Sequence, residues 1–326
     1  MKEFLIDVPV ALIFFNRPDT LEKVFERIKQ ARPSELFLIQ DGARQGRQDD
    51  EKNIQLCRKI VEETDWNCEI HKNYSEENMG CGRRVSSGIS WAFEQADRLI
   101  IIEDDCLVEP TFFNFCEELL EKYKDDERMT MISALNHFGS WDCGGNSYFF
   151  AQTAAIAAWA TWKRVWDNFD LKLSDYNNDY NRKLLAMSIG HKSAAKSRTK
   201  AWQKVSQTAK NEETIKSWGP QFGCLKYQLG GMDIIPSHSL SCNIGVDAQA
   251  TFSGANIKCM RRSLRPMFFQ VTKPIQFPLI HPTAFIPDIE YDRKNQNAQY
   301  PDPFFNFFSR GYYYIKRKIY RIFHIK

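Results

Sequence analysis

The first half of the chain alternates short apolar segments with stretches of helical period. Five short segments, mostly continuous apolar runs, predict strands: 8–15, 36–39, 68–71, 99–102 and 130–134. Apolar positions at helical spacing predict helices between them, at 18–28, 54–61, 85–93 and 112–123. Continuous apolar runs are typical of strands buried on both faces. The alternation therefore predicts an α/β fold, with a mostly parallel sheet flanked by helices.

The second half of the chain has a less regular pattern. Residues 157–169 predict an aromatic-rich helix, with Trp159, Trp162 and Trp166 on one face in the core. The polar segment 170–213 is either a mobile loop or a helix with a solvated face. Further segments predict a helix at 218–229, a strand at 232–235 and proline-punctuated extended chain at 266–287.

Polar side chains follow three of the predicted strands directly. They are Asn16 and Arg17, then Asp41 and Arg44, and finally the run 103–105. Ligands of parallel sheets bind beyond the carboxyl ends of the strands. We therefore expect the three sets to converge on one crevice.

The run Glu103-Asp104-Asp105 is the sharpest candidate for chemistry. Three carboxylates at the end of a buried strand repel one another unless a cation lies among them. Mg²⁺ is usually held by one or two carboxylates together with phosphate oxygens, so a divalent cation bridging to a diphosphate fits this pattern. The alternative is a cluster of acids at a helix N-terminus, but Pro110 and Thr111 begin that helix several residues later.

Two weaker motifs have plain structural alternatives. The segment 78–84, Asn-Met-Gly-Cys-Gly-Arg-Arg, places two glycines and two arginines before a helix, which suits anion binding or a simple turn. Asp41 is placed to accept from a base or ribose, or to form an Asp-Gly turn with Gly42. No histidine has another ligand at metal-binding sequence spacing, so His137, His238 and His281 are expected to be packed or surface residues.

The net positive charge of the chain comes from a tail at 301–326. Formal net charge is +3, but the segment 309–326 holds six basic residues and no acid, which leaves 38 Lys and Arg against 41 Asp and Glu elsewhere. A nucleic-acid partner is therefore not expected, since it would need a basic face on the folded body. Phe308, Tyr312, Ile315, Ile319 and Ile322 recur at helical spacing, which predicts a basic amphipathic helix that associates with an anionic membrane surface. A helix docked on the body or an oligomer contact is the alternative.

Cysteine usage and the apolar pattern bear on the compartment. The nine cysteines form no Cys-x-x-Cys pair, which favours a reducing compartment over zinc sites or disulfides. No apolar run approaches the roughly 20 residues of a membrane-spanning helix. These features predict a cytoplasmic protein, peripheral on the inner face of the cell membrane. We expect three parts: a first half at 1–135, a second half of the same domain at 136–300, and the tail at 301–326.

Taken together, the motifs resemble GT-A glycosyltransferases, specifically bacterial family-two-like sugar transferases related to N-acetylglucosaminyltransferase I. The resemblance covers roughly 8–255 and is carried by these segments: 9–18, 40–42, 78–81, 99–105, 159–166 and 218–245. It implies a GT-A-type sheet, a nucleotide-diphosphate sugar donor, commonly a UDP-sugar, and a lipid-linked or cell-surface glycan acceptor. It also implies a metal-assisted, inverting transfer, with a nucleotide-sugar-binding half at 1–135 and an acceptor-binding half at 136–300.

The resemblance assigns roles to individual residues. The side chains implied in nucleotide-sugar binding are Asn16, Arg17, Asp41, Arg44, Asn78, Arg83, Glu103 and Asp104. Asp105 would ligate Mn²⁺ or Mg²⁺, which would offset charge on the departing diphosphate.

The chain departs from this family at two positions. Trp218-Gly219-Pro220 stands where relatives tend to read Trp-Asp-x, so the expected general base is a glycine. Phe252 stands where relatives often carry a histidine. Three acids nearby in the sequence are weak substitutes for the base: Glu213, Asp233 and Asp247. The alternatives are a catalytically degenerate protein that binds a sugar or a partner enzyme, and, less favoured, a sugar nucleotidyltransferase, whose Gly-rich, Arg-containing loop is missing after the first strand.

Overall fold

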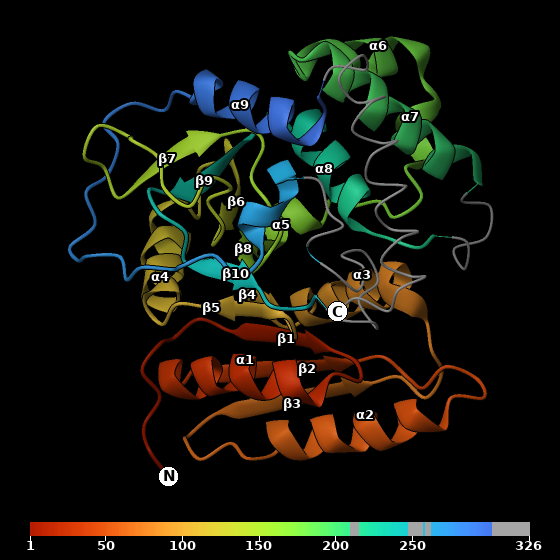
Figure 1. The fold of residues 1–326 in the computed structure, drawn as a ribbon, viewed down its shortest axis with the longest axis vertical. Helices are drawn as coiled ribbons and strands as arrows, with labels where there is room; N and C mark the ends of the chain where they lie inside the picture. The colour runs from red at the N-terminus through yellow and green to blue at the C-terminus, as the bar shows by residue number, and fades with distance from the viewer. Residues whose placement is uncertain (209–214, 247–256, 258–261, 302–326) are drawn as a thin grey trace.

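The fold is given by a computed structural model that describes residues 1–208, 215–246, 257 and 262–301 (Figure 1). Its strands are β1 (Val10–Phe14), β2 (Glu35–Gln40), β3 (Glu69–Tyr74), β4 (Arg98–Glu103), β5 (Cys106–Val108), β6 (Met129–Ser133), β7 (Tyr148–Ala151), β8 (Trp159–Trp162), β9 (Met232–Pro236) and β10 (Ser241–Asn243). Its helices are α1 (Pro18–Ala31), α2 (Gln48–Val61), α3 (Gly80–Phe93), α4 (Thr111–Lys122), α5 (Lys163–Trp166), α6 (Asp179–Ser188), α7 (Lys192–Thr208), α8 (Gly219–Gln228) and α9 (Ile289–Gln299), with 3-10 turns η1 (Ser174–Asn177) and η4 (Arg262–Met267). The predicted amphipathic tail lies, from residue 302 onward, outside the described residues.

Eight strands form one sheet in the order β3-β2-β1-β4-β8-β6-β9-β7, and β5 pairs with β10 in a separate two-stranded sheet. The neighbours β3, β2, β1 and β4 are parallel, and so are β6 and β9. β8 runs antiparallel to both β4 and β6, and β7 runs antiparallel to β9. The sheet is therefore mostly parallel, which confirms the predicted α/β fold class.

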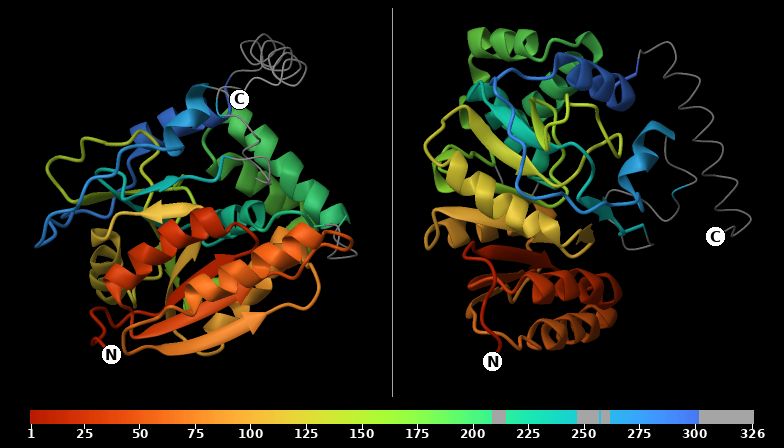
Figure 2. Two further views of the ribbon diagram at one scale, coloured as in Figure 1. Left: turned by 60° about the horizontal axis from the view of Figure 1, so that its bottom comes forward. Right: turned by 90° about the vertical axis from the view of Figure 1, so that its left-hand side faces the viewer.

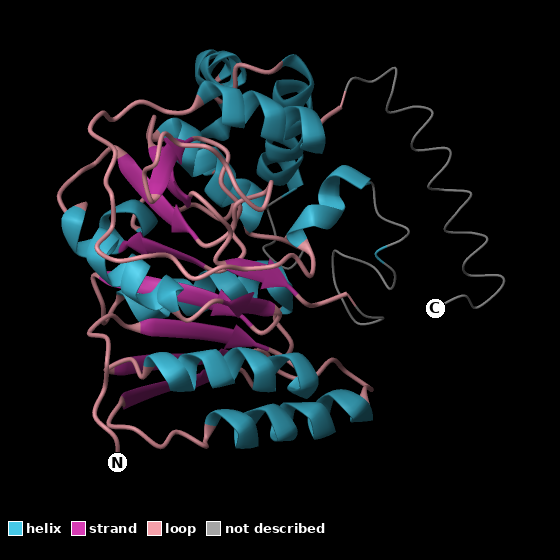
Figure 3. Ribbon diagram, turned by 60° about the vertical axis from the view of Figure 1, so that its left-hand side comes forward, coloured by secondary structure: helices cyan, strands magenta, loops and turns pink. Residues whose placement is uncertain are grey.

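The connections between the first four strands cover both faces of the sheet. α1 and α2 carry the chain outward from β1 to β3, and they pack against each other along this part of the sheet (Figures 2 and 3). α3 then returns the chain across the sheet to β4. Because such crossovers are right-handed, α3 lies on the face opposite α1 and α2. All five residues of β1 are accordingly buried.

One hydrophobic core runs through both halves of the body. Its buried residues extend along the chain from Ile6 to Leu279. A smaller apolar cluster around Tyr176 and Trp202 joins η1, α6, α7 and α8. The predicted boundary between the halves, near residue 135, stays a prediction.

The prediction of one aromatic helix at 157–169 is wrong. Its first part is the strand β8, which lies between β4 and β6 and is buried at all four positions, and only Lys163–Trp166 is helical. The helical spacing of the tryptophans is coincidental, because side chains alternate across a strand. The Trp159 ring stacks on Trp218 (centroids 5.6 Å apart), while Trp162 Nε1 donates to the Leu120 carbonyl (2.9 Å). Aromatic residues also suit strands, so the local sequence was compatible with either structure.

The rest of the second half contains helices and strands that the sequence left undecided or did not predict. The described part of the polar segment 170–213 is largely helical, as α6 and α7, so the helical alternative is confirmed there. Three strands, β5, β7 and β10, and the helix α9 were not predicted. None of the described helices has both the length and the apolar character needed to cross a membrane.

Candidate functional site

The acidic strand end is held together by an arginine from the neighbouring strand. β4 ends at Glu103, and Asp104 and Asp105 follow it beside the parallel strand β1. Arg17, just after β1, donates from Nη1 to Asp105 Oδ2 (3.0 Å) and from Nη2 to Asp104 Oδ1. The N–H of Phe15 also donates to Asp104 Oδ2 (3.1 Å). The sequence predicted a metal ion as the positive charge among these acids. The guanidinium of Arg17 supplies part of that positive charge.

One guanidinium does not balance three carboxylates. Burial, together with the charges of Asp105 and Asp104, raises the pKa of Glu103 to about 8. Burial also raises the pKa of Asp104 to about 6, against the opposing effect of Arg17. This strand end therefore favours taking up a proton or a further cation.

Two of these acids face the main cavity, from which a cation could reach them. Glu103 and Asp105 both line the main cavity, and the Glu103 side chain makes no hydrogen bond or ion pair within the described part of the chain. Asp105 is more constrained, because it accepts from Arg17 and from the Cys106 thiol (Sγ–Oδ1 3.4 Å). Gly245 also packs on it so closely that a Cβ there would lie 2.3 Å from Asp105 Oδ2. Two carboxylates with phosphate oxygens are a donor set that suits Mg²⁺ or Mn²⁺.

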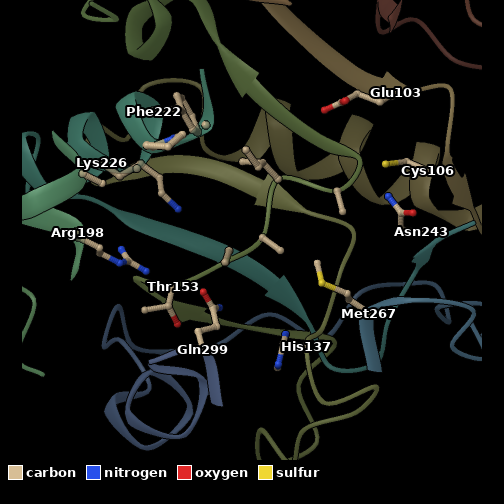
Figure 4. Close-up of a pocket in the computed structure, with 18 of the residues that line it drawn as sticks. Glu103, Cys106, His137, Thr153, Arg198, Phe222, Lys226, Asn243, Met267 and Gln299 are labelled. Carbon is tan, nitrogen blue, oxygen red and sulfur yellow. The ribbon is translucent and has the colours of Figure 1, made fainter. Parts of the chain in front are cut away.

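The cavity that these acids line has a volume of about 730 Å³, within the usual range for small-molecule sites. One wall carries Glu103, Cys106 and Asn243, and the facing wall carries Arg198 and Lys226 (Figure 4). Three alanines and Ile156 of the segment 154–157, before β8, also line the cavity. The cavity is therefore acidic on one side and basic on the other.

The basic wall contains a buried ion pair. Lys226 on α8 donates from Nζ to Asp233 Oδ2 on β9 (2.5 Å), and their side chains are 8% and 1% exposed. Asp233 also accepts from the Thr130 hydroxyl (2.9 Å) and the Ala154 N–H (3.1 Å). Both oxygens of this predicted base candidate are thus engaged, and it does not line the cavity. The other two candidates, Glu213 and Asp247, lie outside the described residues.

The position at which the resemblance predicted a general base lies in the cavity wall. Gly219, the first residue of α8, lines the cavity. A Cβ built on it would lie 2.8 Å from the Ile156 Cδ1 atom, the flexible end of a side chain. A carboxylate at this position would therefore face the cavity after a small shift of Ile156.

Two predicted nucleoside contacts are instead joined by an acid that the sequence did not single out. Asp50, on α2, accepts from Asn16 Nδ2 (2.7 Å) and from Arg44 Nε (2.7 Å). The two hydrogen bonds lower the pKa of Asp50, that from Arg44 most strongly. Asn16 and Arg44 do not line the main cavity.

A third cluster organises the loop before α3. Asp41 accepts from the N–H groups of Met79 (2.8 Å) and Gly80 (2.9 Å), and from Asn78 Nδ2 (3.2 Å). Arg84, on the first turns of α3, donates to the carbonyl of Gln40 (3.1 Å) and is buried. These contacts build the carboxyl edge of β2.

The predicted single crevice is only partly realised. Arg17, Glu103 and Asp105 share the cavity, whereas Asn16, Asp41, Arg44, Asn78, Arg83 and Asp104 are not among its lining residues. The cavity is lined mainly by the end of β4, by the segment 152–157 before β8, and by residues of α7 and α8. The assignment of these six residues to nucleotide-sugar binding stays a prediction.

Two further groups of reactive side chains are two thiols in the cavity wall and an acidic group with a histidine at the far edge of the sheet. Burial raises the pKa of Cys81 to about 12 and that of Cys106 well above its ordinary value, which makes both poor nucleophiles. At the opposite, amino edge of the sheet, ligand atoms of Glu35, Glu69 and His71 lie within 4.8 Å of one another, close enough to hold a metal. Sequence spacing hid this group because Glu35 lies on β2 and the other two on β3.

Sequence reasoning missed Lys226 and Arg198, and it named Asp233 only as a candidate base, not as the partner of Lys226. Lys226 and Asp233 had a usable signal, since each is a lone charge within a mostly apolar element, and buried lone charges usually pair. Arg198 had none, because α7 carries many basic residues and nothing distinguishes the one that lines the cavity.

Comparison with solved structures gives similarities of low identity. A UDP-glucose pyrophosphorylase complexed with UDP-glucose has a TM-score of 0.36 and 10% identity, over 71% of this chain and 91% of that chain. Mannose-1-phosphate geranyltransferase from Thermus thermophilus has a TM-score of 0.35 and 11% identity, over 73% and 75%. HddC from Yersinia pseudotuberculosis, complexed with GMP-PN, has a TM-score of 0.31 and 10% identity, over 50% and 80%. Similarity at this level carries no conclusion about activity.

No family model matches the sequence, and no curated protein matches it. N-acetylglucosaminyltransferase I is not among the similar structures named above, so the resemblance to its relatives stays a prediction. The function is therefore argued from this chain's own residues.

Proposed function

We propose that this chain is a glycosyltransferase that moves a sugar from a nucleotide-diphosphate donor, first of all a UDP-sugar, to a lipid-linked or cell-surface glycan. The observation that carries the proposal is the pair Glu103 and Asp105 in the wall of a cavity of about 730 Å³ at the carboxyl end of β4. This edge is where open α/β sheets bind ligands, and uncompensated carboxylates there suit a cation that bridges to a diphosphate.

In this proposal Glu103 and Asp105 hold Mn²⁺ or Mg²⁺, which when bound would offset negative charge on the leaving diphosphate. Arg17 fixes the position of Asp105 through its Nη1 hydrogen bond (3.0 Å). The nucleoside lies over the ends of β1 and β2, where Asp50 orients Asn16 and Arg44. The acceptor enters from the side of α7 and α8.

The membrane part of the proposal rests on the composition of 301–326. Six basic residues attract the segment to an anionic surface at about 1 kcal/mol each. Co-sedimentation with anionic and neutral liposomes tests this. Truncation after Pro303 should abolish binding to anionic liposomes, and unchanged binding would reject the membrane role without affecting the transferase assignment.

The test of the donor site is nucleotide-sugar binding to the full chain, with and without Mn²⁺, measured by calorimetry. We expect Mn²⁺-dependent binding of a UDP-sugar that weakens about ten- to a hundredfold in Glu103→Gln, since an interaction with a charged group is worth about 1.5–3 kcal/mol. Glu22→Gln, which removes an exposed carboxylate on α1, is the matched control and should bind normally. No binding of any nucleotide sugar to the wild-type chain would reject the proposal.

A second candidate is supported by one specific observation, the glycine at 219 in the cavity wall. An inverting transfer needs a group that deprotonates the attacking hydroxyl. Without an acid on α8, the chain could bind a sugar nucleotide or a partner and not turn over. Donor binding with no hydrolysis or transfer over a broad acceptor panel would favour this binding protein.

A further inference from the structure

Arg198 lines the cavity with its guanidinium close to two tyrosine rings. It lies on α7, is partly buried and lines the cavity on the wall opposite Glu103 (Figure 4). Its Nη1 donates to the Tyr227 hydroxyl (3.2 Å), and its Cζ lies 5.4 Å from the Tyr227 ring centroid and 5.5 Å from that of Tyr300. Two rings from different segments therefore restrict the guanidinium to one position, which lowers the entropy lost when it binds a ligand.

The charge of Arg198 has no acidic partner within the described residues. The other two cavity cations differ in this respect. Lys226 is neutralised by Asp233 (2.5 Å), and Arg17 contacts Asp104 and Asp105. A guanidinium carries five N–H donors in a fork that matches a carboxylate or phosphate. The hydroxyl of Tyr227 accounts for one of these donors, so the others remain for a ligand.

The location of Arg198 separates it from the donor diphosphate. The acidic wall, with Glu103 and Asp105, is the part of the cavity that suits a cation-bound diphosphate. An anion on the facing wall would belong to the other substrate. Ser197 and Gln152 also line the cavity and are hydrogen-bonding groups of the kind that orient a sugar.

We propose that Arg198 binds an anionic group, a carboxylate or a phosphate, on the acceptor, so that the acceptor is an acidic or phosphorylated glycan. The inference rests on the proposed function in that it takes the acidic wall as the donor side. It narrows the acceptor class from glycans in general to anionic ones.

The test uses the full chain and three simple probes at fixed ionic strength: methyl glucuronide, glucose 1-phosphate and neutral methyl glucoside. We expect calorimetry to show binding of an anionic probe, with methyl glucoside binding at least about tenfold more weakly. The two anionic probes distinguish a carboxylate from a phosphate as the preferred group. Equal binding of the neutral glycoside, or no binding of either anionic probe, would overturn the proposal.

The variants separate this inference from the donor assignment. Arg198→Gln should lose about tenfold in affinity for the anionic probe, the size of a lost charged hydrogen bond, while UDP-sugar binding with Mn²⁺ is unchanged. Arg198→Lys, which keeps the charge but not the fork, should lose less. Lys200→Gln removes the same charge from an exposed position of α7 and should bind as the wild type does.

Each failure has its own signature. Unchanged anion binding in Arg198→Gln, or an equal loss in Lys200→Gln, would overturn the Arg198 site alone. Loss of UDP-sugar binding in a folded Arg198→Gln variant would place the donor at this wall and overturn the acceptor assignment. Circular dichroism melting curves of the variants confirm that each compared protein is folded.

Discussion

At the end of β4, three neighbouring carboxylates lie near one guanidinium, that of Arg17, which pairs with only two of them, whereas on the facing wall the Lys226 ammonium meets a single carboxylate. The first arrangement leaves negative charge that only a proton or a cation can offset, and the pKa of Glu103 rises to about 8. In the second, charge is matched and hydrogen bonds from Thr130 and Ala154 complete the carboxylate of Asp233. Matched charges of this kind hold two elements together.

The difference indicates which charges are available to a ligand. In the buried pair Lys226–Asp233 each charge already has its counterion, so neither needs a ligand. The pair instead holds α8 against β9. Glu103 and Arg198 line the same cavity and have no counterion of their own in the described chain. A substrate can therefore supply the opposite charges that Glu103 and Arg198 lack. Lys226 and Asp233 already neutralise each other, and their role is structural.

The largest effect should come from breaking the matched pair. Lys226→Met leaves the Asp233 carboxylate buried without its counterion, and breaking such a pair costs about 3–5 kcal/mol in the free energy of unfolding. Urea unfolding followed by circular dichroism measures it. The double variant Lys226→Met with Asp233→Asn should recover a large part of the loss. A single variant as stable as the wild type would show that the pair does not hold α8 on β9.

Adding a carboxylate to the basic wall should change turnover. If the missing base limits the chain, Gly219→Asp should raise the rate of transfer about a hundredfold, the lower part of the range for general-base catalysis. Product formation from a UDP-sugar measures this rate. Gly219→Asn introduces a side chain of the same size as aspartate, but its amide is far less basic than a carboxylate. This variant should therefore keep the wild-type rate. Equal rates in all three proteins would mean that another group serves as the base.

The parallel part of the fold was predictable because burial on both faces imposes a simple pattern. β1 and β4 read as unbroken apolar runs, and the acids directly after β4 were visible as an interruption of that run. β8 was not predictable in the same way. Its Trp-Ala-Thr-Trp sequence fits a strand or a helix, and only its pairing with β4 and β6 decides between them.

The candidate site was predictable where chemistry follows a strand end, and not where it depends on contacts distant in sequence. Arg17 and Asp105 are 88 residues apart, and their ion pair follows from β1 and β4 being neighbours. Asp50 was hidden among the other acids at the start of α2, although it is the one that holds Asn16 and Arg44. Arg198 required the positions of Tyr227 and Tyr300, which no local pattern reveals.

The smallest loss of stability should come from Arg17→Gln. This variant tests most directly how the incompletely balanced acids at the end of β4 differ from the matched pair. Removing this partly buried guanidinium leaves Asp104 and Asp105 without their counterion, and we expect a loss of about 2 kcal/mol, below the fully buried case because Arg17 is in part solvated. Mn²⁺ should then raise the melting temperature of Arg17→Gln more than that of the wild type, because a cation that binds only the folded strand end stabilises it.

Arg44→Gln is the matched control for this measurement, since Arg44 pairs with Asp50 outside the cavity, where a single carboxylate is left behind. Its melting temperature should respond to Mn²⁺ no more than that of the wild type. A larger response in Arg17→Gln alone would assign the cation to the end of β4, because only there do several acids lose their shared guanidinium. Equal responses in both variants would instead mean that Mn²⁺ binds elsewhere, with the group Glu35, Glu69 and His71 at the amino edge as the next position to test.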